Sequence, residues 1–246
     1  MKIAVLKELA SGERRVSASA ETVKKFIALG ASVAVEAGAG LNASVADADY
    51  AAAGASIGDR ASTVKDAGVI LGVQAPDAAT LTGAAPGAWV AASFNPFGGR
   101  TRVDGYAAAG FEALAMEFMP RITRAQSMDI LSSQSNLSGY KAVLDAAGEY
   151  GKAFPMMMTA AGTVSAARVF IMGVGVAGLQ AIATARRLGA QVSATDVRSA
   201  TKEQIESLGA KAIFVEDVKG IEGEGSGGYA TEMSDEYKAA QAALVS

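Results

Sequence analysis

The sequence predicts an α/β protein of two domains, an N-terminal flavodoxin-like parallel α/β domain and a truncated Rossmann domain. Short apolar segments alternate with segments of helical spacing along the 246 residues. A glycine-rich turn, Gly173 to Gly178, directly follows one of these apolar segments. Only three strands are expected after residue 160, whereas a complete doubly wound domain has about six.

Composition excludes several classes of protein. Half of the residues are apolar, which is enough for a hydrophobic core, and the net charge of -3 does not favour nucleic-acid binding. Cysteine and histidine are both absent. Disulfide frameworks, Ser-His-Asp and Cys-His hydrolases and His-ligated metal sites are therefore excluded within this chain. The charged N-terminal segment lacks the apolar centre of a signal peptide, so we expect a cytoplasmic protein.

The N-terminal domain is expected to span residues 1–125. Its apolar runs are short and separated by helical spacing, which is typical of parallel α/β units. The helix ending at Leu29 is followed by Gly30, a common C-terminal cap. We expect strands at Lys2–Lys7, Ala31–Ala37, Gly68–Gln74, Ala88–Phe94 and Glu112–Glu117, and helices at Glu21–Leu29, around Asp47–Ala53 and around Ser62–Ala67.

A linking segment at residues 126–160 is expected to join this domain to the Rossmann domain at 161–246. Polar residues replace alanine over Met119–Asn136, and a long helix then runs to about Tyr150. Phe154–Ser165 is interpreted as a connector. The second domain is expected to contain strands Ala167–Met172, Gln191–Val197 and Ala212–Val215, and helices Ala177–Leu188, Lys202–Leu208 and Ser234–Val245.

The segment Val169–Ala185 carries no charge over 17 residues, which is the lower limit for a membrane span. Three glycines within six residues would weaken such a helix. We therefore interpret this segment as a buried strand followed by a helix.

The glycine-rich turn has the form G-x-G-x-x-G, and each glycine has a physical role. Gly173 permits a tight strand-to-helix turn, Gly175 lets the backbone approach a pyrophosphate, and Gly178 allows the helix to pack on the strand. The helix N-terminus offers N–H groups and a positive dipole end to phosphates. The pattern predicts a dinucleotide site.

Asp196 ends the next predicted strand, 18 residues beyond Gly178. A carboxylate at this spacing binds the adenosine ribose and repels a 2′-phosphate, which favours NAD(H) over NADP(H). Arg198 complicates this preference because arginine can accept a phosphate. The alternative is a solvated turn carboxylate that caps the helix after Thr201.

The polar run Arg121–Asn136, on composition alone, is an exposed loop with Ser127 or Asp129 as helix caps. However, this run, followed by PMMMTAAGTV, GVGVAGLQAIATA, TDVR and TKEQIESLGAK, closely resembles one family. It is similar to the NAD(H)-binding domain of the α subunit of proton-translocating NAD(P) transhydrogenase, in the alanine dehydrogenase/transhydrogenase family. The resemblance is densest from Met116 to Lys211 and looser at KIAVLKE and GGYATEM.

The resemblance implies a set of site residues. Arg121, Gln126 and Asp129 would orient the nicotinamide ring as catalytic groups that donate no proton. Gly227, with its neighbours, would form a mobile loop that closes over the nucleotide. The cofactor-binding residues implied are Arg121, Gln126, Ser127, Met128, Asp129 and Ser132 at the nicotinamide end, Gly173, Gly175, Val176 and Gly178 at the turn, Asp196, Val197 and Arg198 at the adenosine, and Gly228, Tyr229 and Gln241.

The resemblance also implies the reaction and its partners. The chain would bind NADH and present it for direct hydride transfer to NADP+ on a partner domain, without a metal. The partners would be the membrane-spanning and NADP(H)-binding components of the transhydrogenase, together with a second copy in a homodimer. The chain would be peripheral on the cytoplasmic face of the inner membrane, with no inserted segment and no nucleic acid.

Two alternatives remain open. An alanine dehydrogenase-like enzyme needs an arginine for the substrate carboxylate and a lysine and histidine for proton transfer. Arg15 is available, although a surface position or a structural ion pair is the favoured interpretation of this residue. Gln74 stands where lysine is expected, and histidine is absent. The other alternative is an inactive nucleotide-binding module. TVSAAR lacks the prolines expected there, and the family continues well beyond Ser246.

Overall fold

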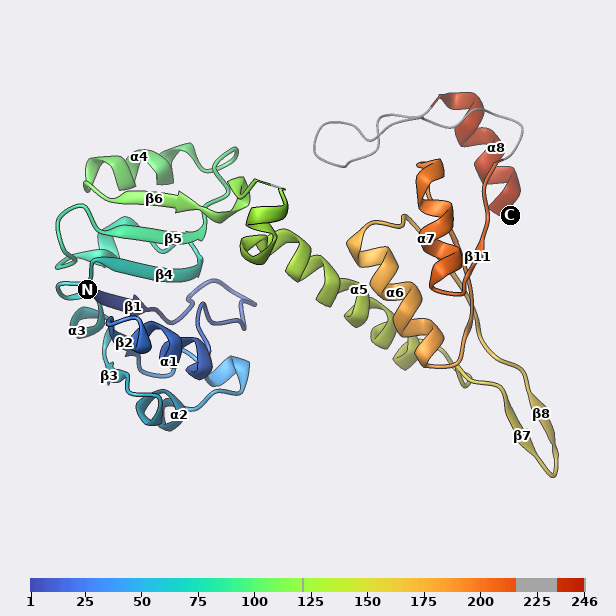
Figure 1. Ribbon diagram of the computed structural model, residues 1–246, viewed down its shortest axis with the longest axis horizontal. Coiled ribbons are helices and arrows are strands. Elements are labelled where there is room, and N and C mark those ends of the chain that lie inside the picture. The colour runs from blue at the N-terminus through green and yellow to red at the C-terminus, as the bar shows by residue number, and fades with distance from the viewer. Residues whose placement is uncertain (121, 216–233, 246) are drawn as a thin grey trace. The chain divides into compact units, whose positions relative to one another are not determined.

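The computed structural model describes residues 1–120, 122–215 and 234–245 of the chain (Figure 1). The chain divides into two compact units, Met1–Asp129 and Ile130–Ser246. The domain limits expected at residues 125 and 160 stay a prediction. Each unit contains a parallel sheet with its own core, so the predicted α/β class is confirmed.

The first unit contains a six-stranded parallel sheet in the order β3-β2-β1-β4-β5-β6. This is the doubly wound Rossmann order, and it differs from the flavodoxin order 2-1-3-4-5 within the same α/β class. Successive strands are added on one side of β1 up to β3, and on its other side from β4. The strands are β1 Lys2–Val5, β2 Ser32–Glu36, β3 Ser56–Gly58, β4 Val69–Gln74, β5 Trp89–Ser93 and β6 Glu112–Ala115.

The two faces of this sheet bury separate clusters, because side chains alternate along each strand. Ile3 and Val5 pack with Val23 of α1 and Tyr50 of α2 on one face. On the other face, Ala4 belongs to a cluster with residues of α3 and α4. The helices are α1 Ala20–Ala28, α2 Asp47–Ala52, α3 Arg60–Val64 and α4 Arg100–Ala108, with short 3₁₀ turns η1 Leu41–Ala43, η2 Ala78–Leu81, η3 Met116–Phe118 and η4 Thr123–Met128.

The sequence predictions for the first unit omitted β3 and α4. Strand β3 has only three residues and ends at Gly58, so it is too short to show alternation. Helix α4 contains Gly105 and has charged residues scattered around it rather than one apolar stripe. Tyr106 anchors this helix in the core, where it is 1% exposed. The remaining predicted elements of this unit are confirmed to within a few residues.

The second unit contains a three-stranded parallel sheet in the order β11-β10-β9, which agrees with the three strands expected. The apolar segment from Val169 forms most of β9 and continues into α6, so the predicted strand followed by a helix is confirmed. The expectation that this strand is buried is wrong, because no residue of β9 is buried and Met172 is 66% exposed. No helix in the described ranges is long and apolar enough to cross a membrane. The elements are α5 Ile130–Glu149, β7 Met157–Thr159, β8 Gly162–Val164, β9 Arg168–Met172, α6 Val176–Arg187, β10 Gln191–Thr195, η5 Ser199–Thr201, α7 Lys202–Ser207, β11 Lys211–Ala212 and α8 Asp235–Val245.

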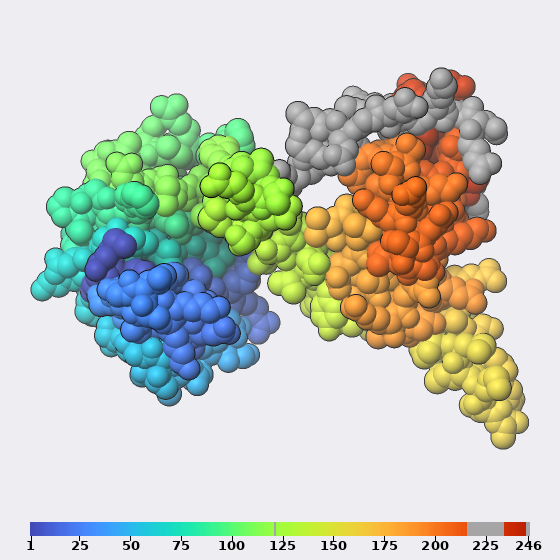
Figure 2. Space-filling model, in the orientation of Figure 1, coloured from blue at the N-terminus to red at the C-terminus, as the bar shows by residue number. Residues whose placement is uncertain are grey.

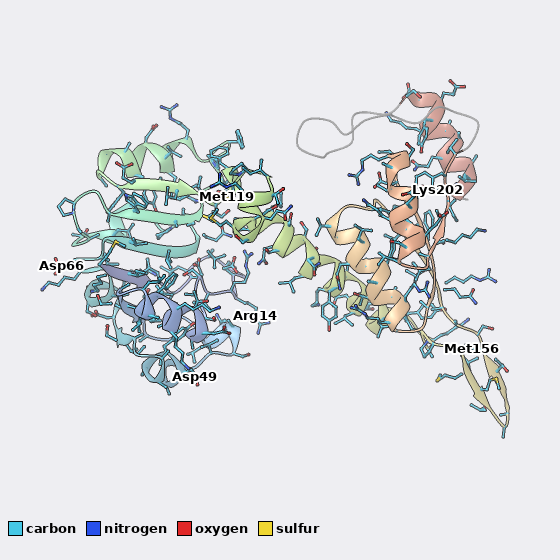
Figure 3. All side chains as sticks on the ribbon, in the orientation of Figure 1. Arg14, Asp49, Asp66, Met119, Met156 and Lys202 are labelled. Atoms are coloured by element: carbon cyan, nitrogen blue, oxygen red, sulfur yellow. The ribbon has the colours of Figure 1, made fainter. Side chains whose placement is uncertain are left out.

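The segment interpreted as a connector, Phe154–Ser165, contains an antiparallel hairpin of β7 and β8, which corrects that interpretation. The hairpin projects from the rest of the second unit (Figure 2). Every residue of both strands is exposed. Met156, which is labelled in Figure 3, and Met158 are 61% and 77% exposed. Pro155 and two threonines obscured the short strands in the sequence.

Helices α5 and α6 pack at close range in the second unit. Gly139 of α5 is buried, and a Cβ at this position would lie 2.0 Å from the carbonyl oxygen of Ala177 in α6. A side chain there cannot be accommodated unless the two helices separate. The small residue at 139 is therefore required by packing.

We expect Gly139→Ala to lower the free energy of unfolding by about 1–3 kcal/mol, because the added methyl group forces α5 and α6 apart. Gly148→Ala is the matched control on the same helix, since no atom lies within 4 Å of a Cβ there. The control should be neutral or should stabilise the chain by up to about 1 kcal/mol through helix propensity. Urea denaturation followed by circular dichroism measures both effects, and equal effects would contradict the packing argument.

Candidate functional site

The glycine-rich turn joins β9 to α6 at the carboxyl end of the second sheet. Gly173 has a φ of +89°, in the left-handed region that favours glycine. Its N–H donates to the carbonyl of Thr195 at 2.9 Å, which ties the turn to the end of β10. Gly175 is the N-cap residue of α6, so the free N–H groups of the first helical turn follow it directly.

The other two glycines of the turn differ in their surroundings. A Cβ on Gly178 would lie 1.9 Å from the carbonyl oxygen of Gly173, so helix packing excludes any side chain there. Gly175 has an ordinary φ of -80°, and no protein atom lies within 4 Å of a Cβ at this position. Neither backbone conformation nor packing requires glycine at 175. Its open side fits the close approach of a pyrophosphate.

Asp196 directly follows β10 and is only 5% exposed. Its Oδ2 accepts hydrogen bonds from the backbone N–H of Val174 at 2.6 Å and from Nη2 of Arg198 at 3.0 Å. Its Oδ1 accepts from the backbone N–H and Nε of Arg198, at 2.8 and 2.9 Å. The alternative of a solvated carboxylate at this position is therefore wrong.

The pKa of Asp196 reflects two opposing effects. Burial, the largest effect, disfavours the charged carboxylate. The hydrogen bonds from the Arg198 side chain and from the N–H groups of Val174 and Arg198 together outweigh it, so that the pKa of Asp196 is lowered. Asp196 is therefore an ionised acceptor beside the turn.

The structure adds a residue that the sequence predictions did not include. Tyr237 of α8 is 3% exposed, and its pKa is raised first by burial and second by the negative charge of Asp196. Its ring therefore lies within electrostatic reach of that carboxylate. Gln241 follows four residues later on the same helix and is half-buried. Tyr237 lies four residues before Gln241, on the same face of the helix, so this spacing in the sequence could have identified it.

The residues predicted for the nicotinamide end are divided between the two units. Gln126, Ser127 and Met128 are exposed on η4 of the first unit, and Asp129 follows them with its N–H 3.3 Å from the carbonyl of Gln126. Ser132 is a half-buried residue of α5 in the second unit. Their roles stay predictions.

The second unit brings together the turn glycines, Val176, Asp196, Val197 and Arg198 around the ends of β9 and β10. Arg121, Gly227, Gly228 and Tyr229 lie outside the described residues. Among the residues that are described, no group of three or more carboxylate side chains is arranged to hold a metal ion.

Arg15 is engaged in an ion pair, as one of the two interpretations of this residue expected. Its Nη2 lies 2.6 Å from Oε2 of Glu13, and its Nε donates to Oε1 at 2.7 Å. Gln74 also donates to Glu13, at 3.2 Å. The side-chain hydrogen bond from Arg15 is the main cause that lowers the pKa of Glu13 to about 2. The Nε and Nη2 groups of Arg15 are thus bonded to Glu13 within the protein.

Two family models match the chain, one over most of its first unit and the other over most of its second unit. Residues 4–138 match the model described as alanine dehydrogenase/PNT, N-terminal domain. Residues 142–245 match the corresponding C-terminal domain. The chain belongs to the alanine dehydrogenase/PNT family.

Within this family, the chain is similar both to transhydrogenase subunits and to alanine dehydrogenases. It is 53% identical over 251 residues to the first part of NAD(P) transhydrogenase subunit alpha of Rhodospirillum rubrum, covering all of this chain and 65% of that protein. It superimposes on the crystal structure of transhydrogenase from Sinorhizobium meliloti with a TM-score of 0.88 at 54% identity, covering 100% of this chain and 66% of the other. The alanine dehydrogenase of Halomonas elongata is 31% identical over 80% of this chain and 53% of that protein. The chain thus spans 65% and 66% of the lengths of these two transhydrogenase relatives.

The residues expected of an amino-acid dehydrogenase site are only partly present in this chain. An amino-acid dehydrogenase needs a general base as well as an anchor for the substrate carboxylate. In this chain histidine is absent, Gln74 stands at the position expected for lysine, and Arg15 is paired with Glu13. These features leave an amino-acid dehydrogenase site without its proton-transfer groups.

The pH dependence of stability should report the ionised state of Asp196. Because its pKa is lowered in the folded chain, the stability that it contributes is complete above the pKa of the unfolded chain, about 4, and is lost as the pH falls through the folded pKa. We expect the difference in unfolding free energy between the unmodified chain and Asp196→Asn to be constant above about pH 5 and to shrink below about pH 4.

Urea denaturation at a series of pH values measures this difference. Asp235→Asn is the control, because the Asp235 side chain is fully exposed and its only described ion pair is a 3.6 Å contact with Lys238. A difference for Asp196→Asn that does not change with pH would contradict the proposed charge state.

Proposed function

We propose that this chain is the NAD(H)-binding component of a proton-translocating NAD(P) transhydrogenase, and that it presents NADH for direct hydride transfer to NADP+ on a partner domain. The observation that carries the proposal is the buried, ionised Asp196 bonded to the backbone of the glycine turn. The same turn leaves Gly175 open and places a helix N-terminus beside it.

Binding of the adenosine ribose requires a specific exchange at Asp196. A carboxylate offers about four lone-pair sites, and Asp196 accepts four described hydrogen bonds. Two of these come from backbone N–H groups and two from the side chain of Arg198. We propose that the two ribose hydroxyls replace the two side-chain bonds. Arg198 then turns toward the rest of the nucleotide, while the backbone bonds keep the carboxylate in place.

The proposed reaction needs orientation more than proton transfer. The bound nicotinamide supplies the hydride, and transfer between two nicotinamide rings moves no other proton at the reacting carbons. A chain without histidine is compatible with this chemistry. Arg121, Gln126 and Asp129 are proposed to orient the ring, and Ser127, Met128 and Ser132 to line its surroundings. Gly228 and Tyr229, in the family's mobile loop, and Gln241 are proposed as further nucleotide contacts.

The partners proposed are the NADP(H)-binding and membrane-spanning components, which would hold the chain on the cytoplasmic face of the inner membrane.

A homodimer is also proposed, and the hairpin of β7 and β8 supports it. An isolated two-stranded hairpin is marginally stable, and this one exposes consecutive methionines, Met156 to Met158. Burial against a second copy would cover them. Sedimentation of the purified chain over a range of concentrations tests the dimer.

We expect Asp196→Ala to weaken NADH binding by about tenfold or more, because a hydrogen bond to a charged group contributes about 1.5–3 kcal/mol. The affinity for AMP should fall by the same factor, since Asp196 is assigned to the adenosine ribose. Fluorescence titration of NADH and calorimetry with AMP measure the two affinities. Asp145→Ala, at an exposed ion pair on α5, is the control and should leave both unchanged. Equal affinities in Asp196→Ala and the unmodified chain would refute the assignment.

We expect the chain, mixed with a partner NADP(H)-binding domain, to transfer hydride from NADH to an NADP+ analogue, with a rate nearly independent of pH between about 6 and 8 because histidine is absent. Gln126→Ala should slow transfer by about tenfold or more through loss of ring orientation. Arg124→Ala, an exposed neighbour on η4, is the control. Stopped-flow absorbance measures the rate, and alanine or pyruvate turnover without the partner would support an amino-acid dehydrogenase instead.

A further inference from the structure

The side chain of Arg198 forms a two-point contact with the carboxylate that is assigned to the adenosine ribose. Its Nε donates to Oδ1 of Asp196 at 2.9 Å, and its Nη2 donates to Oδ2 at 3.0 Å. A guanidinium thus meets both carboxylate oxygens with two neighbouring donors. The two hydroxyl groups of a ribose are also two neighbouring donors. Arg198 and a ribose therefore require the same acceptor positions on Asp196.

The backbone of Arg198 is held separately from its side chain. Its N–H donates to Oδ1 of Asp196 at 2.8 Å. Its carbonyl accepts from the N–H of Thr201 at 3.1 Å and from the Thr201 hydroxyl at 2.8 Å. Thr201 is 4% exposed, whereas the side chain of Arg198 is 16% exposed. The guanidinium can therefore leave Asp196 by rotation about side-chain bonds while the backbone stays in place.

The guanidinium of Arg198 also lies beside the glycine turn. Its Nη2 and the backbone N–H of Val174 donate to the same oxygen, Oδ2 of Asp196. Val174 lies between Gly173 and Gly175, in the turn that is proposed to hold the pyrophosphate. A guanidinium that leaves Asp196 therefore stays close to this turn, and arginine binds phosphate oxygens with paired N–H donors.

The charge of Arg198 determines which ligands can replace it on Asp196. The ion pair is neutral as a whole, and the ribose hydroxyls that replace the guanidinium carry no charge. The guanidinium then loses its negative partner in partly buried surroundings, which costs free energy unless another anion pairs with it. The pyrophosphate of a dinucleotide supplies this anion, whereas a nucleoside does not.

We propose that Arg198 is a specificity-determining residue, which competes with the ribose for Asp196 and pairs with the phosphates once the ribose is bound. The site thereby selects ligands that carry both a free ribose diol and a phosphate, and it disfavours nucleosides. This inference rests on the proposed NAD(H)-binding function and extends it. A purely structural role for Arg198 predicts instead that its loss weakens nucleosides and nucleotides alike.

Isothermal titration calorimetry of the full 246-residue chain with adenosine and with ADP tests the proposal, at about pH 8, well above the ordinary aspartate pKa of about 4. Arg198→Met keeps a long side chain but removes its charge and its donors. We expect adenosine to bind about threefold or more tightly to this variant, because the competitor is gone. The preference for ADP over adenosine should fall by about fivefold or more, because the phosphates lose their partner.

Arg198→Lys separates competition from phosphate binding, because lysine keeps the charge but cannot match both carboxylate oxygens with paired donors. Adenosine should again bind about threefold or more tightly, while the preference for ADP stays within about twofold of that of the unmodified chain. Arg187→Met is the control, at an exposed arginine that ends α6 about 17 Å along the helix from the turn. It should change neither affinity.

Circular dichroism checks that each variant is folded. The proposal is overturned if Arg198→Met and Arg198→Lys leave the affinity for adenosine unchanged or weaken it, or if Arg187→Met changes both affinities as much as Arg198→Met does. Titration of the unmodified chain with NADH distinguishes two kinds of failure. If NADH binds and the Arg198 variants behave like the unmodified chain, only the role of Arg198 is refuted, whereas a chain that does not bind NADH refutes the proposed function as well.

Discussion

The hydrogen bond from the N–H of Val174 to the carboxylate of Asp196 is the interaction on which the candidate site depends. It joins the ends of β9 and β10 and fixes the glycine turn against the second strand. Since the carboxylate is buried, this bond and those from Arg198 are also what keeps it ionised. The hydrogen bonds to Asp196 therefore determine both the geometry of the turn and the charge that would select a ribose.

Hydrogen bonds from a backbone N–H to a carboxylate also join neighbouring strands in the first unit. Glu36 at the end of β2 accepts from Lys7 after β1, and Glu8 after β1 accepts from Val73 of β4. Glu117, after β6, accepts from Asn95, after β5. In each case a carboxylate at or just beyond the carboxyl end of one parallel strand accepts a hydrogen bond from a backbone N–H at or near the end of its neighbour. The carboxyl edges of both sheets, where ligands of α/β proteins bind, are stabilised in this way.

Sequence patterns predicted most of the strands and helices because short apolar runs, helical spacing and glycine caps are local signals. The glycine turn and Asp196 were equally accessible, since their spacing reflects one strand–turn–helix–strand unit. The charge environment of Asp196 was not, because the bonds from Val174 and the approach of Tyr237 depend on tertiary contacts. The hairpin of β7 and β8 has no periodic signature, since its two strands are too short.

The exposed methionines of the hairpin have a consequence for redox chemistry. Met156, Met157 and Met158 are 61%, 44% and 77% exposed in the single chain. Peroxide can therefore reach their thioether sulfur atoms whenever the proposed homodimer is dissociated. Oxidation to the sulfoxide converts a flexible apolar side chain into a polar one. Oxidation of these methionines would therefore weaken the proposed packing of the hairpin against a second copy, and methionine sulfoxide reductases would restore it.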